Sequence, residues 1–240
     1  MTLRLSIIIP CFNEENLILS ILQKVANTVL ENNCEKEIII VDDGSTDNTV
    51  KNLETFRASM PDLLFKLLRN ETNQGKGASI RKALSGVTGD ITVIQDADLE
   101  YDPADYNKML RLIVEGHADV VYGSRFRGSE PHRVLFFFHT MGNKLLTFLS
   151  NLLTQLNLTD METGYKMFKT SILKAVRLRE NRFGFEAEIT ARISKIRKIR
   201  IYEVGISYYG RGYEEGKKIN WRDGIRAIYC IIRYNLFSGN

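Results

Sequence analysis

The sequence predicts an α/β fold in which a mixed, mainly parallel sheet is flanked by helices and followed by a C-terminal amphipathic helix. Short β-branched runs alternate with segments of helical periodicity through the first half of the chain, an order typical of βαβ units. The run Ile38–Val41 is apolar without interruption, as in strands that are buried on both faces. A chain of 240 residues, 44% of them hydrophobic, is long enough to bury a substantial core.

The strands of the first half are expected where β-branched and apolar residues cluster. They are Leu5–Ile9, Glu37–Val41, Leu63–Leu68, Ile91–Ile94 and Asp119–Tyr122. The segments between them carry apolar residues at the spacing of a helix. These helices are expected at Glu14–Leu30, Asp47–Arg57, Gly77–Ser85 and Asp105–Val114.

The second half has a different character. Gly123–Arg133 is rich in Gly, Ser, Arg and Pro and is predicted to be a loop. Helices are expected at Val134–Leu158, Phe185–Ile196 and Trp221–Leu236, a strand at Ile199–Val204 and a polar loop at Gly205–Ile219. No clear linker divides the chain, so we expect one domain over residues 1–210, with a mobile loop and a helix over residues 211–240.

Cysteine usage and the N-terminus indicate the compartment. Three scattered cysteines, Cys11, Cys34 and Cys230, argue against a disulfide framework and fit a reducing environment. The three histidines lack zinc-ligand spacing. Because the N-terminus has no signal-peptide pattern and no apolar run reaches about 18 residues, we expect a cytoplasmic protein. Basic residues crowd the region from Lys195 to Arg233, which suits either an anionic surface or an ordinary solvated face.

Polar clusters follow four of the predicted strands, at the edge where open α/β sheets bind ligands. They are Pro10–Glu15, Asp42–Asp47, Asn73–Gly77 and Asp96–Glu100. Each cluster alone is compatible with a turn, a helix cap or a helix entry. Their succession at four strand ends predicts a binding site.

The last cluster has the strongest chemical implication. A buried-looking strand leads to three carboxylates within five positions, Asp96, Asp98 and Glu100. Neighbouring carboxylates repel one another unless a cation compensates them, and oxygen ligands suit Mg²⁺ or Mn²⁺. Such an ion makes a diphosphate a good leaving group. The chain carries no DNA-binding signature, so the expected ligand is a nucleotide diphosphate and not a nucleic acid.

The ordered set of motifs resembles the inverting family 2 glycosyltransferases with the GT-A fold, in particular the dolichyl- and polyprenyl-phosphate sugar transferases such as the dolichol-phosphate mannosyltransferases. The resemblance covers essentially the whole chain. It implies that Asp98 is the principal metal ligand, with Asp96 on the ribose and metal side and Glu100 as a further ligand. Some relatives have Gln at the position of Glu100. The extra charge of Glu here leaves the choice between Mg²⁺ and Mn²⁺ open. The residues that it assigns to the nucleotide-sugar are Pro10, Phe12, Glu14, Asp43, Gly75, Lys76 and Asp96.

The resemblance also implies an acceptor side. Arg125, in Gly123-Ser124-Arg125-Phe126, is similar to the arginine that meets the acceptor phosphate, and Arg127 and Arg133 are further candidates unless they belong to an ordinary basic loop. Planar guanidinium groups suit phosphate recognition. Asp160 occupies a position sometimes assigned as the base. Arg211 and Lys217 would clamp the donor diphosphate from a mobile loop, or lie on a solvated one.

The expected reaction is metal-dependent transfer of a sugar from a UDP- or GDP-sugar to a polyprenyl phosphate. The alternatives are a hydroxyl acceptor with Asp160 as base, a nucleotidyltransferase and a non-catalytic nucleotide-binding module. A dehydrogenase is disfavoured because no Gly-x-Gly-x-x-Gly turn follows the first strand. The helices Val134–Leu158 and Trp221–Leu236 combine apolar with basic residues, which suits either a membrane interface or core packing. A membrane-protein anchor or a homo-oligomer is compatible with these surfaces.

Overall fold

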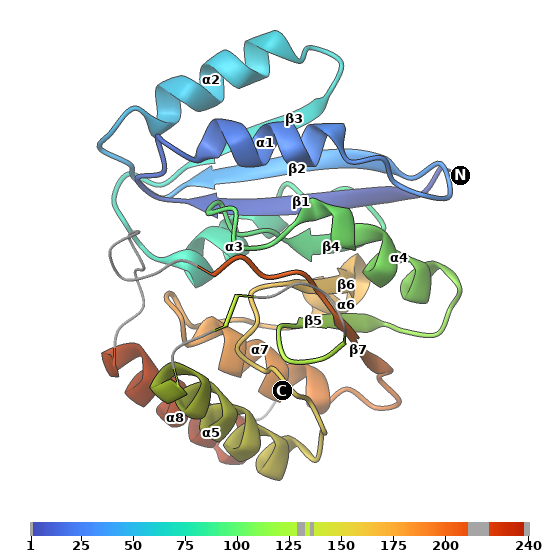
Figure 1. The fold of residues 1–240 in the computed structure, drawn as a ribbon, viewed down its shortest axis with the longest axis vertical. Helices are drawn as coiled ribbons and strands as arrows, with labels where there is room; N and C mark the ends of the chain where they lie inside the picture. The colour runs from blue at the N-terminus through green and yellow to red at the C-terminus, as the bar shows by residue number, and fades with distance from the viewer. Residues whose placement is uncertain (1, 129–132, 135–136, 211–220, 238–240) are drawn as a thin grey trace.

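The computed structural model describes residues 2–128, 133–134, 137–210 and 221–237 (Figure 1). In this part of the chain, seven strands form one sheet in the order β3-β2-β1-β4-β6-β5-β7. Neighbouring strands are parallel, except that β6 runs antiparallel to β4 and β5. The strands are β1 (Arg4–Cys11), β2 (Glu35–Asp42), β3 (Leu64–Arg69), β4 (Ile91–Ile94), β5 (Val120–Ser124), β6 (Lys166–Lys169) and β7 (Ile201–Gly205).

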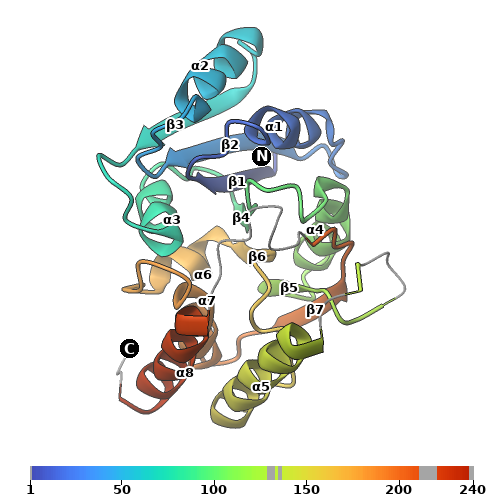
Figure 2. The same cartoon turned by 60° about the vertical axis from the view of Figure 1, so that its left-hand side comes forward.

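Helices cover both faces of this sheet (Figure 2). Apolar residues of α1 (Ile18–Asn27), α2 (Thr49–Ser59) and α4 (Tyr106–Val114) belong to one core cluster. The opposite cluster receives residues of α3 (Lys76–Leu84), α6 (Thr170–Ala175), α7 (Phe185–Ser194) and α8 (Trp221–Leu236). The predicted mainly parallel sheet between two layers of helices is therefore confirmed.

The central strands supply both cores by simple alternation. Ile7 and Ile9 of β1 face the first cluster, whereas Ile8 faces the second. In β2, Ile38 and Ile40 alternate in the same way with Ile39 and Val41. Successive side chains of a strand point to opposite faces, so a strand covered on both sides requires an uninterrupted apolar run.

Three elements differ from the prediction. β6 and the short α6 that follows it were not predicted, because Lys-Met-Phe-Lys is only four residues long and its ends are charged. Tertiary pairing creates this strand: Met167 lies opposite Val93 of β4 and Val121 of β5. The predicted helix Glu14–Leu30 begins only at Ile18, since Glu14 first accepts turn hydrogen bonds from the N–H groups of Leu17 and Ile18.

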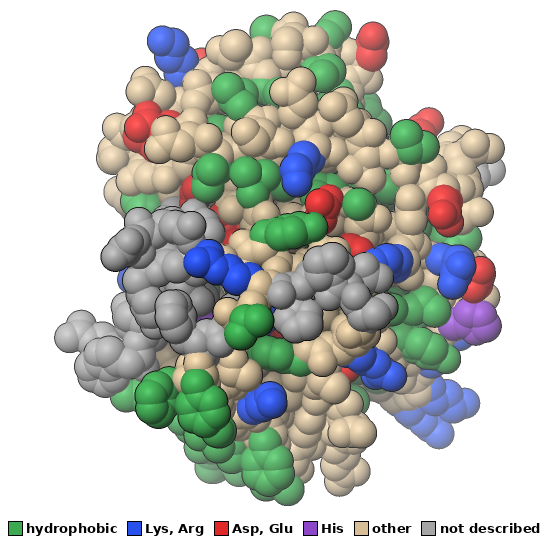
Figure 3. Space-filling model, in the orientation of Figure 1, with side chains coloured by type: hydrophobic (Ala, Val, Ile, Leu, Met, Phe, Trp, Pro, Cys, Tyr) green, Lys and Arg blue, Asp and Glu red, His purple; other side chains and the backbone are tan. Residues whose placement is uncertain are grey.

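The C-terminal helix α8 packs on α7 and on α5 (Phe137–Thr154). Its inner residues Cys230, Ile231 and Tyr234 are buried. The outer sides of α5 and α8 remain apolar and exposed, and the lower left of Figure 3 shows green side chains gathered over α5. Among the residues that the structure describes, no helix is both long and apolar enough to cross a membrane.

Candidate active site

The carboxyl ends of β1 and β2 bring the first two polar clusters into contact. Cys11 pairs with Asp42 at the end of the ladder, and the Asp43 N–H donates to the Cys11 carbonyl at 2.8 Å. Asn13 then ties the two loops together: its N–H donates to Ser45 Oγ at 2.9 Å, and its Oδ1 accepts the Thr46 N–H at 2.9 Å. Asn13 has a φ of 51°, a conformation that asparagine tolerates better than most residues.

The predicted base-binding residues line this junction. Glu14 is buried, and Pro10 and Phe12 are half-buried. The Glu14 backbone N–H donates to Thr49 Oγ1 at 2.8 Å, which fixes the loop against the start of α2. The segment that follows β1 is therefore held against α2, and Pro10 and Phe12 keep part of their surface open.

Asp43 organises the loop that leads into α3. Its Oδ1 accepts from Asn70 Nδ2 at 2.7 Å and from the Gln74 N–H at 3.0 Å, and its Oδ2 accepts the Gly75 N–H at 2.7 Å. Gly75 has a φ of 100°, a region that glycine enters without strain. Asp43 was predicted to contact the nucleotide base. In this structure it also has a positioning role, because it holds the start of α3 beside the ends of β1 and β2.

Lys76 connects this loop to the aspartate cluster after β4. Its Nζ lies 2.7 Å from Asp96 Oδ1 and 3.1 Å from Glu186 Oε1, and its side chain is 14% exposed. Burial alone would lower the pKa of Lys76, but the charges of Asp96 and Glu186 raise it well above its usual value. Lys166 approaches Glu186 from the other side. Asp96, Lys76, Glu186 and Lys166 thus form a row of alternating charges.

The three predicted metal ligands do not converge as one group. Asp98 Oδ1 accepts the Glu100 N–H at 3.3 Å, and Glu100 Oε2 accepts the Tyr208 hydroxyl at 2.8 Å. Over the described residues, no three acidic, histidine or cysteine side chains are grouped so that they could hold an ion. Two carboxylates, Asp96 and Asp98, still fit Mg²⁺ or Mn²⁺, because Mg²⁺ often binds one or two carboxylates together with substrate phosphates.

On the acceptor side, Arg125 forms a buried bidentate pair with Asp160. Arg125 Nε and Nη2 donate to Asp160 Oδ2 and Oδ1 at 2.6 and 2.7 Å. The Arg125 backbone N–H adds a third bond to Oδ2 at 3.0 Å. Asp160 is fully buried and Arg125 nearly so. Arg125 therefore engages both carboxylate oxygens of Asp160, the residue predicted as a candidate base.

Of the other predicted arginines, Arg133 lies beside Tyr208 and Arg127 beside Glu203. Arg133 is exposed; its backbone N–H donates to the Tyr208 carbonyl at 2.9 Å and its Nη1 to the Gly210 carbonyl at 2.8 Å. Arg127 has a side chain that is 58% exposed and lies 3.6 Å from Glu203. The ring of Tyr208 also packs against the Arg125 guanidinium. Arg211 and Lys217 fall outside the described residues.

The predicted donor and acceptor sides meet at Gly164, which precedes β6. A Cβ at this position would overlap Asp96 Oδ2. The Gly164 N–H donates to the Tyr101 hydroxyl at 3.0 Å, and the Tyr101 ring stacks on that of Tyr165. The loop after Asp160 therefore packs directly against the predicted metal-binding aspartate.

Sequence reasoning missed Glu186, Glu162 and Tyr208. Glu186 lies in the first turn of α7, and an acidic residue there is ordinary for any helix because it suits the helix dipole. Glu162 stands in the segment around Asp160 but matches no local motif. Tyr208 is brought to Glu100 by an isolated bridge between Tyr101 and Tyr208. No local pattern marks these residues, because they reach the site through tertiary packing.

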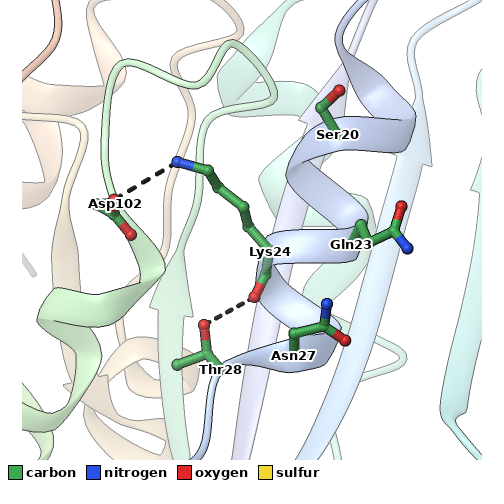
Figure 4. Close-up of a pocket in the computed structure, with 6 residues that line it drawn as sticks. All are labelled: Ser20, Gln23, Lys24, Asn27, Thr28 and Asp102. Carbon is green, nitrogen blue, oxygen red and sulfur yellow. Dashed lines mark hydrogen bonds and ion pairs between the residues drawn. The ribbon is translucent and has the colours of Figure 1, made fainter.

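An open hollow of about 480 Å³ lies beside α1, away from these residues (Figure 4). Lys24 reaches across it to Asp102 at 3.5 Å. None of the predicted site residues lines it; its lining consists of Ser20, Gln23, Lys24, Asn27, Thr28 and Asp102. We assign no role to this hollow.

Comparison with known proteins gives a consistent result. The family model described as Glycosyl transferase family 2 matches residues 6–177. The UDP-N-acetylglucosamine–dolichyl-phosphate N-acetylglucosaminyltransferase of Methanococcus voltae is 28% identical over 94% of this chain and 94% of its own length. The dolichol-phosphate mannosyltransferase of Pyrococcus furiosus is 24% identical over 97% of this chain, which spans 64% of that protein.

Solved structures share the fold. Glucosyl-3-phosphoglycerate synthase from Mycobacterium tuberculosis, in complex with Mn²⁺, UDP and glucosyl-3-phosphoglycerate, superposes with a TM-score of 0.73. The match covers 99% of this chain and 81% of that chain at 17% sequence identity. At this identity the similarity concerns the architecture of the sheet and its helices.

Proposed function

Because the chain belongs to glycosyl transferase family 2, we propose that it transfers a sugar from a nucleotide diphosphate sugar to a polyprenyl phosphate with the help of Mg²⁺ or Mn²⁺. The chain is a glycosyltransferase related to polyprenyl-phosphate sugar transferases. The contact of Lys76 and Gly164 with Asp96 is the observation that supports metal-assisted transfer to a polyprenyl phosphate. It joins the donor-side loops to the loop that follows Asp160.

The donor side is supported by the start of α3. The N–H groups at a helix N-terminus favour an anion, and here that N-terminus lies beside the buried cation of Lys76. Asp96 and Asp98 would hold the metal, which when bound neutralises the charge that develops on the leaving diphosphate. The half-buried Pro10 and Phe12 supply an apolar surface for the base.

The acceptor side favours a phosphate over a hydroxyl. A phosphate oxygen already carries negative charge at neutral pH, so it needs positioning more than a strong base. A hydroxyl acceptor needs a carboxylate to take its proton, but Asp160 is engaged by Arg125 through three hydrogen bonds. Arg127 and Arg133 are exposed near this pair and would contact the phosphate. The dolichyl-phosphate substrates in the names of the relatives support the same class of acceptor.

A donor screen tests the proposal. The protein is incubated with UDP- and GDP-sugars, Mg²⁺ or Mn²⁺, and a short polyprenyl phosphate, and nucleoside diphosphate release and the lipid product are followed by mass spectrometry. We expect a sugar–phosphate–lipid together with one nucleoside diphosphate per transfer. Release of inorganic diphosphate would indicate a nucleotidyltransferase. Glycosylation of a free glycan without any lipid product would overturn the polyprenyl phosphate assignment.

We also propose that the outer sides of α5 and α8 rest on a membrane surface, where such an acceptor lies. Phe138 and Phe148 of α5 are 86% and 62% exposed, and Ile225 and Leu236 of α8 about as much. Exposed apolar patches of this kind mark interaction sites. Basic residues, among them Lys144 and Arg233, are exposed on the same two helices. Apolar and basic side chains together suit a helix that lies in the interface of an anionic bilayer.

A further inference from the structure

Glu162 is a buried carboxyl group that the proposed reaction has not used. It lies in the loop between Asp160 and Gly164, which precedes β6. The residue is half-buried, but its Oε1 is inaccessible to solvent and has no hydrogen-bond partner among the described residues. An ionised buried oxygen without a partner is unfavourable. We therefore asked which chemical role a carboxyl group could have at this position.

Four charged groups act electrostatically on Glu162, and they already form pairs with one another. Arg125, which follows β5, is bound to Asp160 of the same loop as Glu162. Lys166 of β6 is bound to Glu186 of α7. Glu162 is therefore the additional carboxyl in an otherwise balanced cluster. Burial raises the pKa of Glu162 to about 7, the charges of Glu186 and Asp160 add to this effect, and Lys166 and Arg125 oppose it. The group can gain or lose a proton near neutral pH.

We propose that Glu162 holds the proton of the acceptor site: it takes the proton of the acceptor phosphate and, in its neutral form, donates a hydrogen bond to the resulting dianion. This inference rests on the proposed function, because it requires a phosphate monoester as the acceptor. Asp160 cannot take this part, since Arg125 occupies both of its oxygens. Glu162 is the neighbouring carboxyl whose Oε1 has no hydrogen-bond partner among the described residues.

The transfer conserves both protons and charge. The second ionisation of a phosphate monoester has a pKa of about 6, so a proton shared between the phosphate and Glu162 resides mainly on Glu162. A lone pair of the dianionic phosphate oxygen forms the bond to the anomeric carbon, while the bond from that carbon to the diphosphate oxygen breaks and its electrons leave with the nucleoside diphosphate. The proton stays on Glu162 until the product departs, and it is then released to water.

The same scheme defines how acceptor binding depends on pH. With both groups ionised, Glu162 repels the phosphate dianion, so binding at high pH must take up a proton. At pH 8 the wild type should take up close to one proton per acceptor. Its affinity for the phosphate dianion should be about eightfold weaker than at pH 6.5, because the fraction of the protein that carries the required proton falls from about three quarters to about one tenth.

Isothermal titration calorimetry with farnesyl phosphate at pH 8, in buffers of different ionisation enthalpy, measures this proton uptake directly. Glu162→Gln keeps the size and the hydrogen-bond donor but cannot titrate, so its uptake should fall close to zero and its affinity should not weaken between pH 6.5 and pH 8. Glu115→Gln, an exposed carboxyl at the end of α4, should behave as the wild type. Equal proton uptake in Glu162→Gln and the wild type would overturn the proposal.

Kinetics give a second readout that a purely structural role would not change. Plotted against pH, kcat/KM for the acceptor should be bell-shaped in the wild type, with limbs at about 6 for the phosphate and about 7 for Glu162. Glu162→Gln should lose only the alkaline limb, and Glu162→Asp should keep one. Thermal unfolding verifies that both variants fold. Transfer with an unchanged alkaline limb in Glu162→Gln overturns this inference alone. Absence of both phosphate binding and lipid product overturns the proposed function with it.

Discussion

Gly164 lies against the carboxylate of Asp96 so closely that no side chain fits between them. A Cβ here would overlap Asp96 Oδ2 and come within 3.1 Å of Lys76 Nζ. We therefore expect Gly164→Ala to displace Asp96 and to lower kcat/KM for the donor about tenfold or more, since an error of about 1 Å in a site can reduce a rate a hundredfold. Steady-state assays at varied donor concentration measure the effect. Gly142→Ala in α5, where a Cβ meets nothing within 4 Å, should retain full activity.

Asp98 is the predicted principal metal ligand, and its substitution should separate chemistry from folding. We expect Asp98→Asn to reduce metal-dependent turnover about a hundredfold or more, because even groups that only support a metal ligand contribute 10- to 100-fold. Its melting temperature should stay close to that of the wild type, since the Asn oxygen can still accept the Glu100 N–H. Asp62→Asn, an exposed carboxyl, is the control. Full activity of Asp98→Asn in chelator-treated buffer would contradict the metal assignment.

The raised pKa of Glu162 should also make the stability of the protein depend on pH. Its pKa is about 7 in the fold against an ordinary value of 4.5, so the native state binds this proton more tightly than the unfolded chain. The free energy of unfolding should therefore fall as pH rises from about 4.5 to 7, by at most about 3 kcal/mol. Glu162→Gln should be more stable than the wild type at pH 8.5 and nearly equal to it at pH 5 in urea denaturation. A difference that is the same at both pH values would contradict this account.

At the scale of elements, the strands and helices with a strong local pattern were predictable from the sequence. The apolar run at Ile38–Val41 identified β2 because burial on both faces leaves no polar position. β6 was not predictable, because it exists only through pairing with β4 and β5. The same contrast holds in the site. Asp96 and Asp98 follow a strand in a local motif that made them candidates, whereas Glu186 meets Lys76 only after α7 has packed.

A buried ion pair connects β6 and α7, so its removal should lower the free energy of unfolding. Lys166 is fully buried and binds Glu186 and the Thr163 carbonyl. Lys166→Met leaves Glu186 with Lys76 as its remaining cation, and we expect a loss of about 3 kcal/mol in the free energy of unfolding. Urea denaturation measures it. The double variant Lys166→Met with Glu186→Gln should be less destabilised than the single one, since no unpaired charge stays buried. A loss below about 1 kcal/mol, as for an exposed pair, would contradict the role of this contact.

At the scale of the whole molecule, the predicted donor and acceptor residues lie at different halves of the sheet. The parallel strands β1, β2 and β4 end in the loops proposed to bind the donor, and the segments next to β5, β6 and β7 contain the arginines and carboxylates proposed for the acceptor. The prediction of a donor side rests on short motifs at strand ends. The acceptor half depends on contacts between distant segments, such as Glu203 with Thr159 and Asp160, which no local pattern encodes. The surface of α5 and α8 lies on this second half of the molecule (Figure 1).

This surface should bind membranes through its apolar residues. Insertion of one phenylalanine contributes about 1.5–3 kcal/mol, so Phe138→Asp and Phe148→Asp should each weaken sedimentation with phosphatidylglycerol vesicles about tenfold or more. Val29→Asp, which changes an equally exposed apolar residue outside both helices, should not. Salt should weaken the binding without abolishing it, because the basic residues act through a screened field and the apolar ones do not. Unchanged vesicle binding by the double variant Phe138→Asp with Phe148→Asp would show that another surface meets the membrane.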